Sequence, residues 1–169
     1  MLAPGAASQE HQPYLVELFA IKLHSGLLNR IGDLHIRCKP PIDMPEQAIK
    51  IHGITDADVK AEPSFISIYD KLYDFFSGAE IFVCHNVGFD KMVLYWELYR
   101  RGKVLNFPWA KRDICTVEIS QQMKGYRMTL VDLYIELFGE GFTGAHSASV
   151  DCEMTMKCFV ELVRRELIK

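Results

Sequence analysis

The stretch Cys-His-Asn-Val-Gly-Phe-Asp at Cys84–Asp90 decides how this chain folds. The apolar run Ile81–Cys84, which leads into it, has the length and composition of a buried strand. After it, apolar residues recur at helical spacing: Phe89, Met92, Val93, Trp96 and Tyr99. A polar segment thus joins a strand to a helix, and Asp90 is predicted in the first turn of that helix.

A second polar stretch, His-Ser-Ala-Ser-Val-Asp at His146–Asp151, opens another predicted helix. Near the positive end of the helix dipole, Asp151 is favoured in the ionised form that a metal ligand must have. The five-residue offset turns His146 away from Asp151 on a continuous helix, so His146 is predicted on the loop before it. A loop histidine beside carboxylates that hold a metal suits a general base acting on water. The two stretches together indicate a metal-dependent hydrolytic site.

Asp90 and Asp151 have a simpler alternative explanation. Acidic residues at helix N-termini commonly satisfy backbone N–H donors, and either residue alone would be interpreted that way. Their occurrence together with His146 favours the catalytic hypothesis.

The pattern His85-Asn86-x-x-Phe89-Asp90, followed by His146-x4-Asp151, resembles the second and third motifs of the DEDDh family. These are the DnaQ-like 3′-5′ exonucleases, which include polymerase proofreading subunits and ribonuclease T. The stretch Ile51–Thr55 resembles another recurrent piece of that family, and the resemblance covers nearly the whole chain.

The resemblance implies a role for each of these residues. Asp151 and Asp90 would be metal ligands for Mg2+ or Mn2+, with two ions in the complete family site, and His146 would deprotonate the attacking water. His85, Asn86 and Phe89 would bind substrate by shaping the pocket for the terminal nucleotide. Phe89 could pack against a base or fill the core, and its place in the helical stripe favours the core.

The family's first motif, an Asp-x-Glu at the end of an opening strand, is absent: none precedes Tyr14. The resemblance implies an α/β fold of the ribonuclease-H-like kind, a mixed sheet flanked by helices, in which that opening strand is central. It would lie between strands predicted at 14–24 and 81–84, so its absence predicts a gap. We therefore expect low stability, or flanking strands that close up or borrow a strand.

The remaining elements follow from local patterns. Residues 14–24 and 29–38 are predicted to form a hairpin, residues 106–110 a short extended piece, and residues 113–123 a helix. Glu17 alternates with apolar residues on the first strand. It is either a satisfied acid or a supporting group beside the metal site, and we favour the former.

Composition sets the remaining limits. A chain of 169 residues, 49% apolar and 24% charged, suits a single exonuclease domain over 1–169, with 1–13 expected to be a mobile N-terminal segment. A net charge of −3 and a pI near 6.1 argue against a basic nucleic-acid wrapper but allow a local positive groove. No apolar stretch reaches the ~18 residues of a membrane span. The five scattered cysteines indicate reduced core residues in a cytoplasmic protein.

Two functional hypotheses remain. The first is a 3′-5′ exonuclease, working in DNA replication or repair, that cuts phosphodiester bonds at the 3′ end of single-stranded DNA or RNA, with a DNA polymerase as a candidate partner. In it, the chain as given is N-terminally truncated and impaired. The second is a non-catalytic module of exonuclease fold that binds nucleic acid or a polymerase. The family spacing of Asp90, His146 and Asp151 favours the first.

Overall fold

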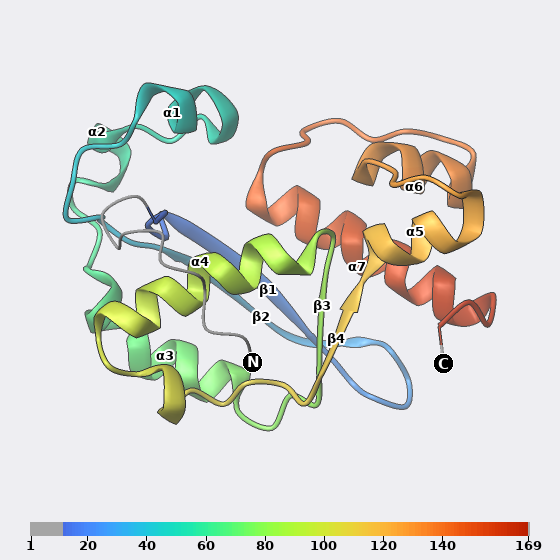
Figure 1. The fold of residues 1–169 in the computed structure, drawn as a ribbon, viewed down its shortest axis with the longest axis horizontal. Coiled ribbons are helices and arrows are strands. Elements are labelled where there is room, and N and C mark those ends of the chain that lie inside the picture. Colours follow the sequence, from blue (N-terminus) through green and yellow to red (C-terminus); the bar gives the residue numbers. More distant parts are fainter. Residues whose placement is uncertain (1–11, 169) are drawn as a thin grey trace.

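The computed structural model describes residues 12–168, and its elements alternate between strands and helices after an opening hairpin (Figure 1). In chain order they are β1 (Glu17–Leu23), β2 (Arg30–Arg37), α1 (Glu46–His52), α2 (Asp56–Val59), α3 (Phe65–Phe76), β3 (Ile81–Cys84), α4 (Val87–Arg100), the 3-10 helix η2 (Val104–Asn106), β4 (Arg112–Cys115), α5 (Thr116–Lys124), α6 (Leu130–Phe138) and α7 (Ala148–Arg164).

The predicted hairpin is confirmed. β1 and β2 pair antiparallel, with Glu17 opposite Arg37 and Ile21 opposite Asp33. The register shifts after Lys22, next to the turn. β1 is apolar along most of its length, yet none of its seven residues is fully buried.

The second strand pair is parallel, and it corrects two predictions. β3 forms where the sequence predicts it and pairs with β4, which places Ile81 opposite Arg112. The extended piece predicted at 106–110 does not form a strand: a 3-10 turn ends at Asn106, and the strand begins only at Arg112. The helix predicted at 113–123 begins at Thr116, since the residues before it are used in β4. A four-residue strand is too short for its alternation to show in the sequence.

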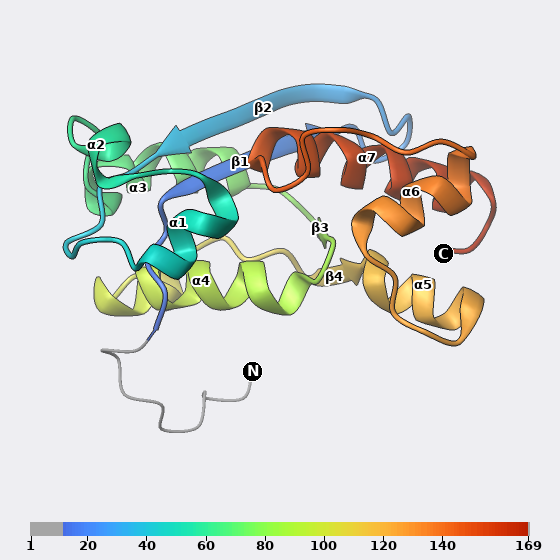
Figure 2. The same ribbon diagram turned by 90° about the horizontal axis from the view of Figure 1, so that it is seen from above.

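The strands of residues 12–168 form two separate two-stranded sheets, β1–β2 and β3–β4. α7 packs against both β1 and β3, so the two sheets face one another across a gap beneath this helix (Figures 1 and 2). In the described part of the chain no strand joins them. Among residues 12–168, the strands β1 and β3 that flank the predicted gap have therefore not closed up on one another.

Helices flank the strands on both sides, as predicted for the fold class. α3 and α4 build the larger core, in which Leu72 and Leu98 are fully buried. α5, α6 and α7 form a second cluster around Leu133 and Leu162 (Figure 1). Among residues 12–168, no helix has the length and apolar character needed to cross a membrane.

The start of the described chain is tied to α4. Arg100 donates hydrogen bonds to the carbonyl oxygens of Gln12 (2.7 Å) and Pro13 (3.1 Å). The guanidinium of Arg100 also lies 3.8 Å from the ring centroid of Tyr14. The mobile segment expected at 1–13 falls, for residues 1–11, outside the described residues.

Candidate active site

The first wall of the site is the junction between β3 and α4. His85 and Asn86 connect the two elements, and Asn86 caps the helix with a left-handed backbone (φ 77°). Asparagine is one of the few residues that tolerate this conformation. The tight connection places Asp90 in the first turn of α4, as the sequence predicts.

The second wall is the start of α7. Asp151 lies in the first turn of this helix, and His146 lies on the preceding loop, both as predicted. The backbone N–H of His146 points at the Asp151 carboxylate, with its nitrogen 3.1 Å from Oδ2 and 3.3 Å from Oδ1. The loop conformation, with φ 73° at His146, therefore fixes the orientation of the carboxylate.

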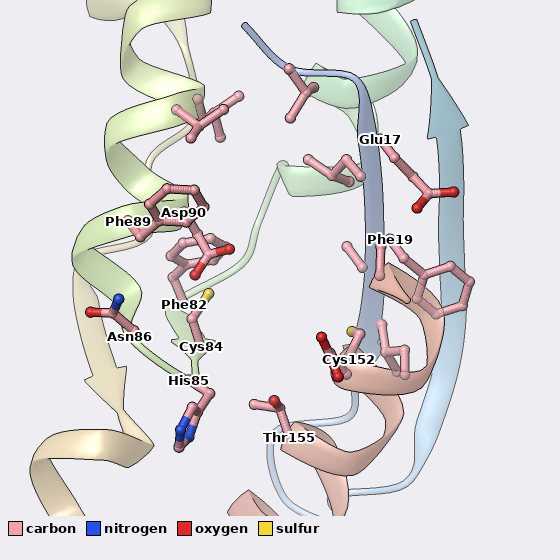
Figure 3. Close-up of a pocket in the computed structure, with 18 of the residues that line it drawn as sticks. Glu17, Phe19, Phe82, Cys84, His85, Asn86, Phe89, Asp90, Cys152 and Thr155 are labelled. Atoms are coloured by element: carbon pink, nitrogen blue, oxygen red, sulfur yellow. The ribbon is translucent and has the colours of Figure 1, made fainter. Parts of the chain in front are cut away.

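A single large cavity of about 1630 Å3 lies between these walls and β1 (Figure 3). Every site residue proposed from the sequence lines it: His85, Asn86, Phe89, Asp90, His146 and Asp151. Stretches far apart in the sequence thus meet at one cavity, with one carboxylate from α4 and one from α7. That Asp90 and Asp151 share one cation beside His146 stays a prediction.

Asp90 titrates at an unusual pH. Its carboxyl group is open to the cavity but is surrounded by protein, and this desolvation raises its pKa from 3.8 to about 6. A hydrogen bond with the Cys84 thiol opposes the rise. The Asp90 carboxyl group therefore keeps its proton to a higher pH than an ordinary aspartate does.

The pKa values of Asp151 and His85 are shifted in opposite directions. Burial raises the pKa of Asp151, although the hydrogen bond from His146 and the charge of its ring act in the opposite sense. Burial lowers the pKa of His85 and favours its neutral ring. Nδ1 of His85 lies 2.9 Å from Oγ1 of Thr116, the buried first residue of α5. His85 is thereby held toward α5, away from Asp90 (Figure 3).

Phe89 corrects a sequence prediction. The helical stripe favours Phe89 as a core residue, but the side chain is 56% exposed. The first turn of α4 borders the cavity, and Phe89 is among the residues that line it (Figure 3). Phe89 is free to contact a ligand.

Glu17 lines the same cavity but is already satisfied. Its Oε1 lies 2.9 Å from both His35 Nε2 and Arg37 Nε on β2, and the side chain turns toward that strand (Figure 3). Burial acts to raise the pKa of Glu17, but these hydrogen bonds outweigh it and lower the pKa. The geometry supports the simpler interpretation of a paired acid.

Two residues beside the site were not anticipated. The Cys84 thiol is hydrogen-bonded to Asp90, and the Thr116 hydroxyl is hydrogen-bonded to His85. Cys84 and Cys152 also line the cavity, so these two of the five free cysteines are not the core residues that the sequence indicates. Thr116 could have been found only by predicting β4, which brings it beside His85.

The site has few ligands for a metal. Within residues 12–168, no group of three or more His, Cys, Asp or Glu side chains is placed to hold an ion. Asp90 and Asp151 supply hard oxygen donors, which suit Mg2+ or Mn2+. Two carboxylates fit an ion that keeps several waters and shares substrate phosphate oxygens, but not a closed cage.

Comparison with known proteins supplies independent information. A family model for exonucleases of the RNase T type matches residues 3–159 of this chain. The chain is 28% identical over 149 residues to the DNA polymerase III subunit epsilon of Haemophilus influenzae, covering 83% of this chain and 55% of that protein. It is 34% identical over 152 residues to the same subunit of Rickettsia felis, covering 88% and 65%. This chain thus spans less than two thirds of either relative.

Solved structures share the fold at low sequence identity. The nuclease domain of 3′hExo, a DEDDh family member bound to rAMP, superposes with a TM-score of 0.77 and 15% identity, over 96% of this chain and 87% of that one. Exonuclease X in complex with 5′ overhanging duplex DNA gives a TM-score of 0.69 and 22% identity, over 94% and 87%.

Proposed function

Because this chain belongs to the exonuclease family whose model spans residues 3–159, we propose that it acts as a DEDDh-type 3′-5′ exonuclease domain on nucleic acid ends. The observation that carries the proposal is the meeting of Asp90, Asp151 and His146 at one cavity. One structural neighbour holds duplex DNA and another holds rAMP, so the proposed substrate is a 3′ end of DNA or RNA. The polymerase III relatives support a DNA polymerase as a partner.

Divalent metal ions are general in this exonuclease family. In this chain Asp90 and Asp151 would hold such an ion, as Mg2+ or Mn2+, because they are the carboxylates of the two family motifs and both line the cavity. When bound, the ion supplies charge stabilisation at the scissile phosphate and activates water. Because burial raises the pKa of Asp90, protons would compete with the ion for this carboxyl group as the pH falls.

The chain's own residues supply the remaining chemistry. His146, on the loop before α7, takes the proton from the attacking water through its imidazole. Its backbone N–H stays on Asp151, so the side chain can act while the loop keeps the carboxylate in place. The exposed ring of Phe89 packs against the terminal base, which is worth about 1–3 kcal/mol per base in single-strand binding.

The number of ligands limits the activity that we propose. Asp90 and Asp151 are two carboxylates, whereas the complete family site uses four to hold two ions. We infer that residues 12–168 alone hydrolyse substrate orders of magnitude more slowly than a complete site. The lack of a cluster of three ligands in this part of the chain also supports the second candidate, a module that binds nucleic acid or a polymerase without catalysis.

The test is a digestion assay with a 5′-labelled single strand and Mn2+ at pH 8, compared with the same strand carrying a blocked 3′ end. Slow shortening into a ladder from the 3′ end is the expected result. Asp151→Asn and His146→Ala should each abolish it. Asp70→Asn, on the exposed side of α3, is the matched control and should leave the rate unchanged.

Two outcomes would decide against the enzyme. Binding of the strand without any shortening would favour the non-catalytic module. Shortening that persists in Asp151→Asn would show that the activity comes from another site or a contaminant.

A further inference from the structure

We propose that His85 is a positioning residue, which sets the place of Asp90 relative to Asp151 through hydrogen bonds to α5 and to the segment that follows it. This role rests on the proposed function, because Asp90 and Asp151 are the carboxylates assigned there to the metal ion. It differs from the role that the resemblance implies for His85, which is contact with the terminal nucleotide.

The parallel register of β3 and β4 brings His85 and Thr116 together. The last paired residues of the two strands are Cys84 and Cys115. His85 and Thr116 come next along the chain from each strand, and side chains at one level of neighbouring strands point to the same face of a sheet. Accordingly, Nδ1 of His85 lies 2.9 Å from Oγ1 of Thr116, which is fully buried.

The His85 ring makes a second hydrogen bond, to the backbone of Met128. Burial lowers the pKa of His85 and favours the neutral ring, which has one donor and one acceptor nitrogen. The bond to Met128 acts in the opposite sense and raises the pKa, so the ring donates and the Met128 carbonyl oxygen accepts. Nδ1 then accepts the hydroxyl proton of Thr116. Neither nitrogen is left to bind a nucleotide.

Met128 is itself held in place by a second buried hydroxyl group. Ser120 lies one turn after Thr116 on α5 and is fully buried. Its Oγ accepts the backbone N–H of Met128 (3.0 Å) and donates to the carbonyl oxygen of Val117 (2.7 Å). The N–H and the carbonyl group of Met128 are therefore both bonded, one to α5 and the other to His85.

These bonds connect the two walls of the site. His85 directly precedes Asn86, from which α4 begins, and Asp90 lies in the first turn of that helix. α5 holds the other end of the bonds and packs against α7, the helix that carries Asp151 in its first turn (Figure 1). Displacement of His85 would therefore move the Asp90 carboxylate with respect to Asp151. Groups that orient metal ligands in this way contribute to metal affinity without touching the ion.

Direct contact between His85 and a nucleotide is the alternative. The ring would have to turn away from α5, toward which it points (Figure 3). That movement would leave the hydroxyl of Thr116 and the carbonyl group of Met128 buried without a partner, which is unfavourable. The hydrogen bonds therefore favour positioning over contact.

The first experiment measures the separation of the walls in the whole chain, with EDTA present and no substrate. Spin labels are introduced as non-natural amino acids at Met92 on α4 and Lys157 on α7, both of which are exposed. His85→Ala should shift or broaden the distribution of distances between the labels. Thr116→Val removes only the hydroxyl group and should do the same, whereas Thr116→Ser keeps it and should match the parent. If His85→Ala does not fold, the two Thr116 variants decide the question.

The second experiment measures Mn2+ binding from the electron paramagnetic resonance signal of the free ion. His85→Ala and Thr116→Val should each weaken binding at least about tenfold. His85→Gln keeps a donor and an acceptor and should recover part of that loss. The double variant should lose no more than His85→Ala alone, because both residues act through one bond. A parent chain that binds no Mn2+ would contradict the proposed function, while the label distances would still test the role of His85.

Three results would overturn the positioning role. Unchanged label distances in both His85→Ala and Thr116→Val would show that these bonds do not set the separation of the walls. A lower melting temperature, with unchanged distances and unchanged Mn2+ affinity, would make His85 a purely structural residue. Weaker binding of a single strand to His85→Ala in EDTA, with unchanged distances, would identify His85 as a direct contact of the nucleotide.

Discussion

Two apolar regions of this molecule lie side by side, and they differ in how far their side chains are buried. Around α3 and α4, residues such as Leu72 and Leu98 are fully buried. Between β1 and β3, the apolar residues of both strands remain half-exposed, and Ile81 is 43% exposed. The comparison teaches that an apolar pattern specifies which side chains favour burial, whereas neighbours on both strand edges determine whether they reach it.

The largest expected difference between the regions is in the cost of removing a side chain. Ile68→Ala, in the closed core, should lower the free energy of unfolding by about 2–5 kcal/mol because it leaves a cavity. Ile21→Ala, on the wall of the cavity, should cost about 1 kcal/mol, because this side chain is only half-buried. Urea denaturation followed by circular dichroism measures both, and equal costs would break the comparison.

The next effect concerns the link between the two regions. Glu97 on α4 is 2% exposed, accepts the N–H of Leu15 at 2.9 Å and lies 3.5 Å from Arg100. Glu97→Ala should cost about 1–3 kcal/mol, because it leaves a buried backbone donor unsatisfied. Glu97→Gln keeps an acceptor oxygen and should recover part of that loss. If the two variants lose the same free energy, the bond to Leu15 is not what matters.

A smaller effect should appear in the pH dependence of stability. Because the pKa of Asp90 is about 6 in the folded protein and 3.8 ordinarily, the folded state binds more protons between those values. Stability attributable to Asp90 therefore falls as pH rises from about 4 to about 6. Asp90→Asn should remove this component and stabilise the protein at pH 8 by less than about 1 kcal/mol, discounted because the group is open to water.

Thermal melts of both proteins from pH 4 to 8, with EDTA present, measure the difference. Asp70→Asn is the control, since Asp70 is exposed on α3. A variant that is less stable than the parent at pH 8 would mean that the Asp90 carboxylate is favourably paired.

The smallest expected effect is at Phe89. Since this ring is 56% exposed, Phe89→Ala should change the free energy of unfolding by no more than about 0.5 kcal/mol. Phe76→Ala, at a ring that is 7% exposed, should cost about 3–5 kcal/mol. A large loss of unfolding free energy in Phe89→Ala would show that the packed core reaches the cavity wall, and would move the boundary between the two regions.

The sequence predicts the elements whose signals are local. Local patterns predict the β1–β2 hairpin, β3 and the first turns of α4 and α7, because each combines an apolar pattern with a distinct turn or cap. β4 was missed because its four residues carry no periodicity and its pairing with β3 is a tertiary event. The burial of Phe89 was wrongly predicted because a helical stripe does not show where its cover stops.

The sequence predicts which residues line the candidate site, but not how their side chains are arranged. The family motifs identify Asp90, His146 and Asp151, and these side chains do line one cavity. Their electrostatics depend on contacts that no motif encodes, such as the Cys84 thiol beside Asp90 and the backbone N–H of His146 on Asp151.

The left-handed backbone at His146 has a further consequence. Most side chains avoid this conformation at a cost of about 1–2 kcal/mol per residue, and glycine adopts it freely. Glycine at position 146 would therefore adopt this backbone conformation with less strain than histidine does. If His146 is the general base, His146→Gly should lower the rate of hydrolysis and raise the melting temperature.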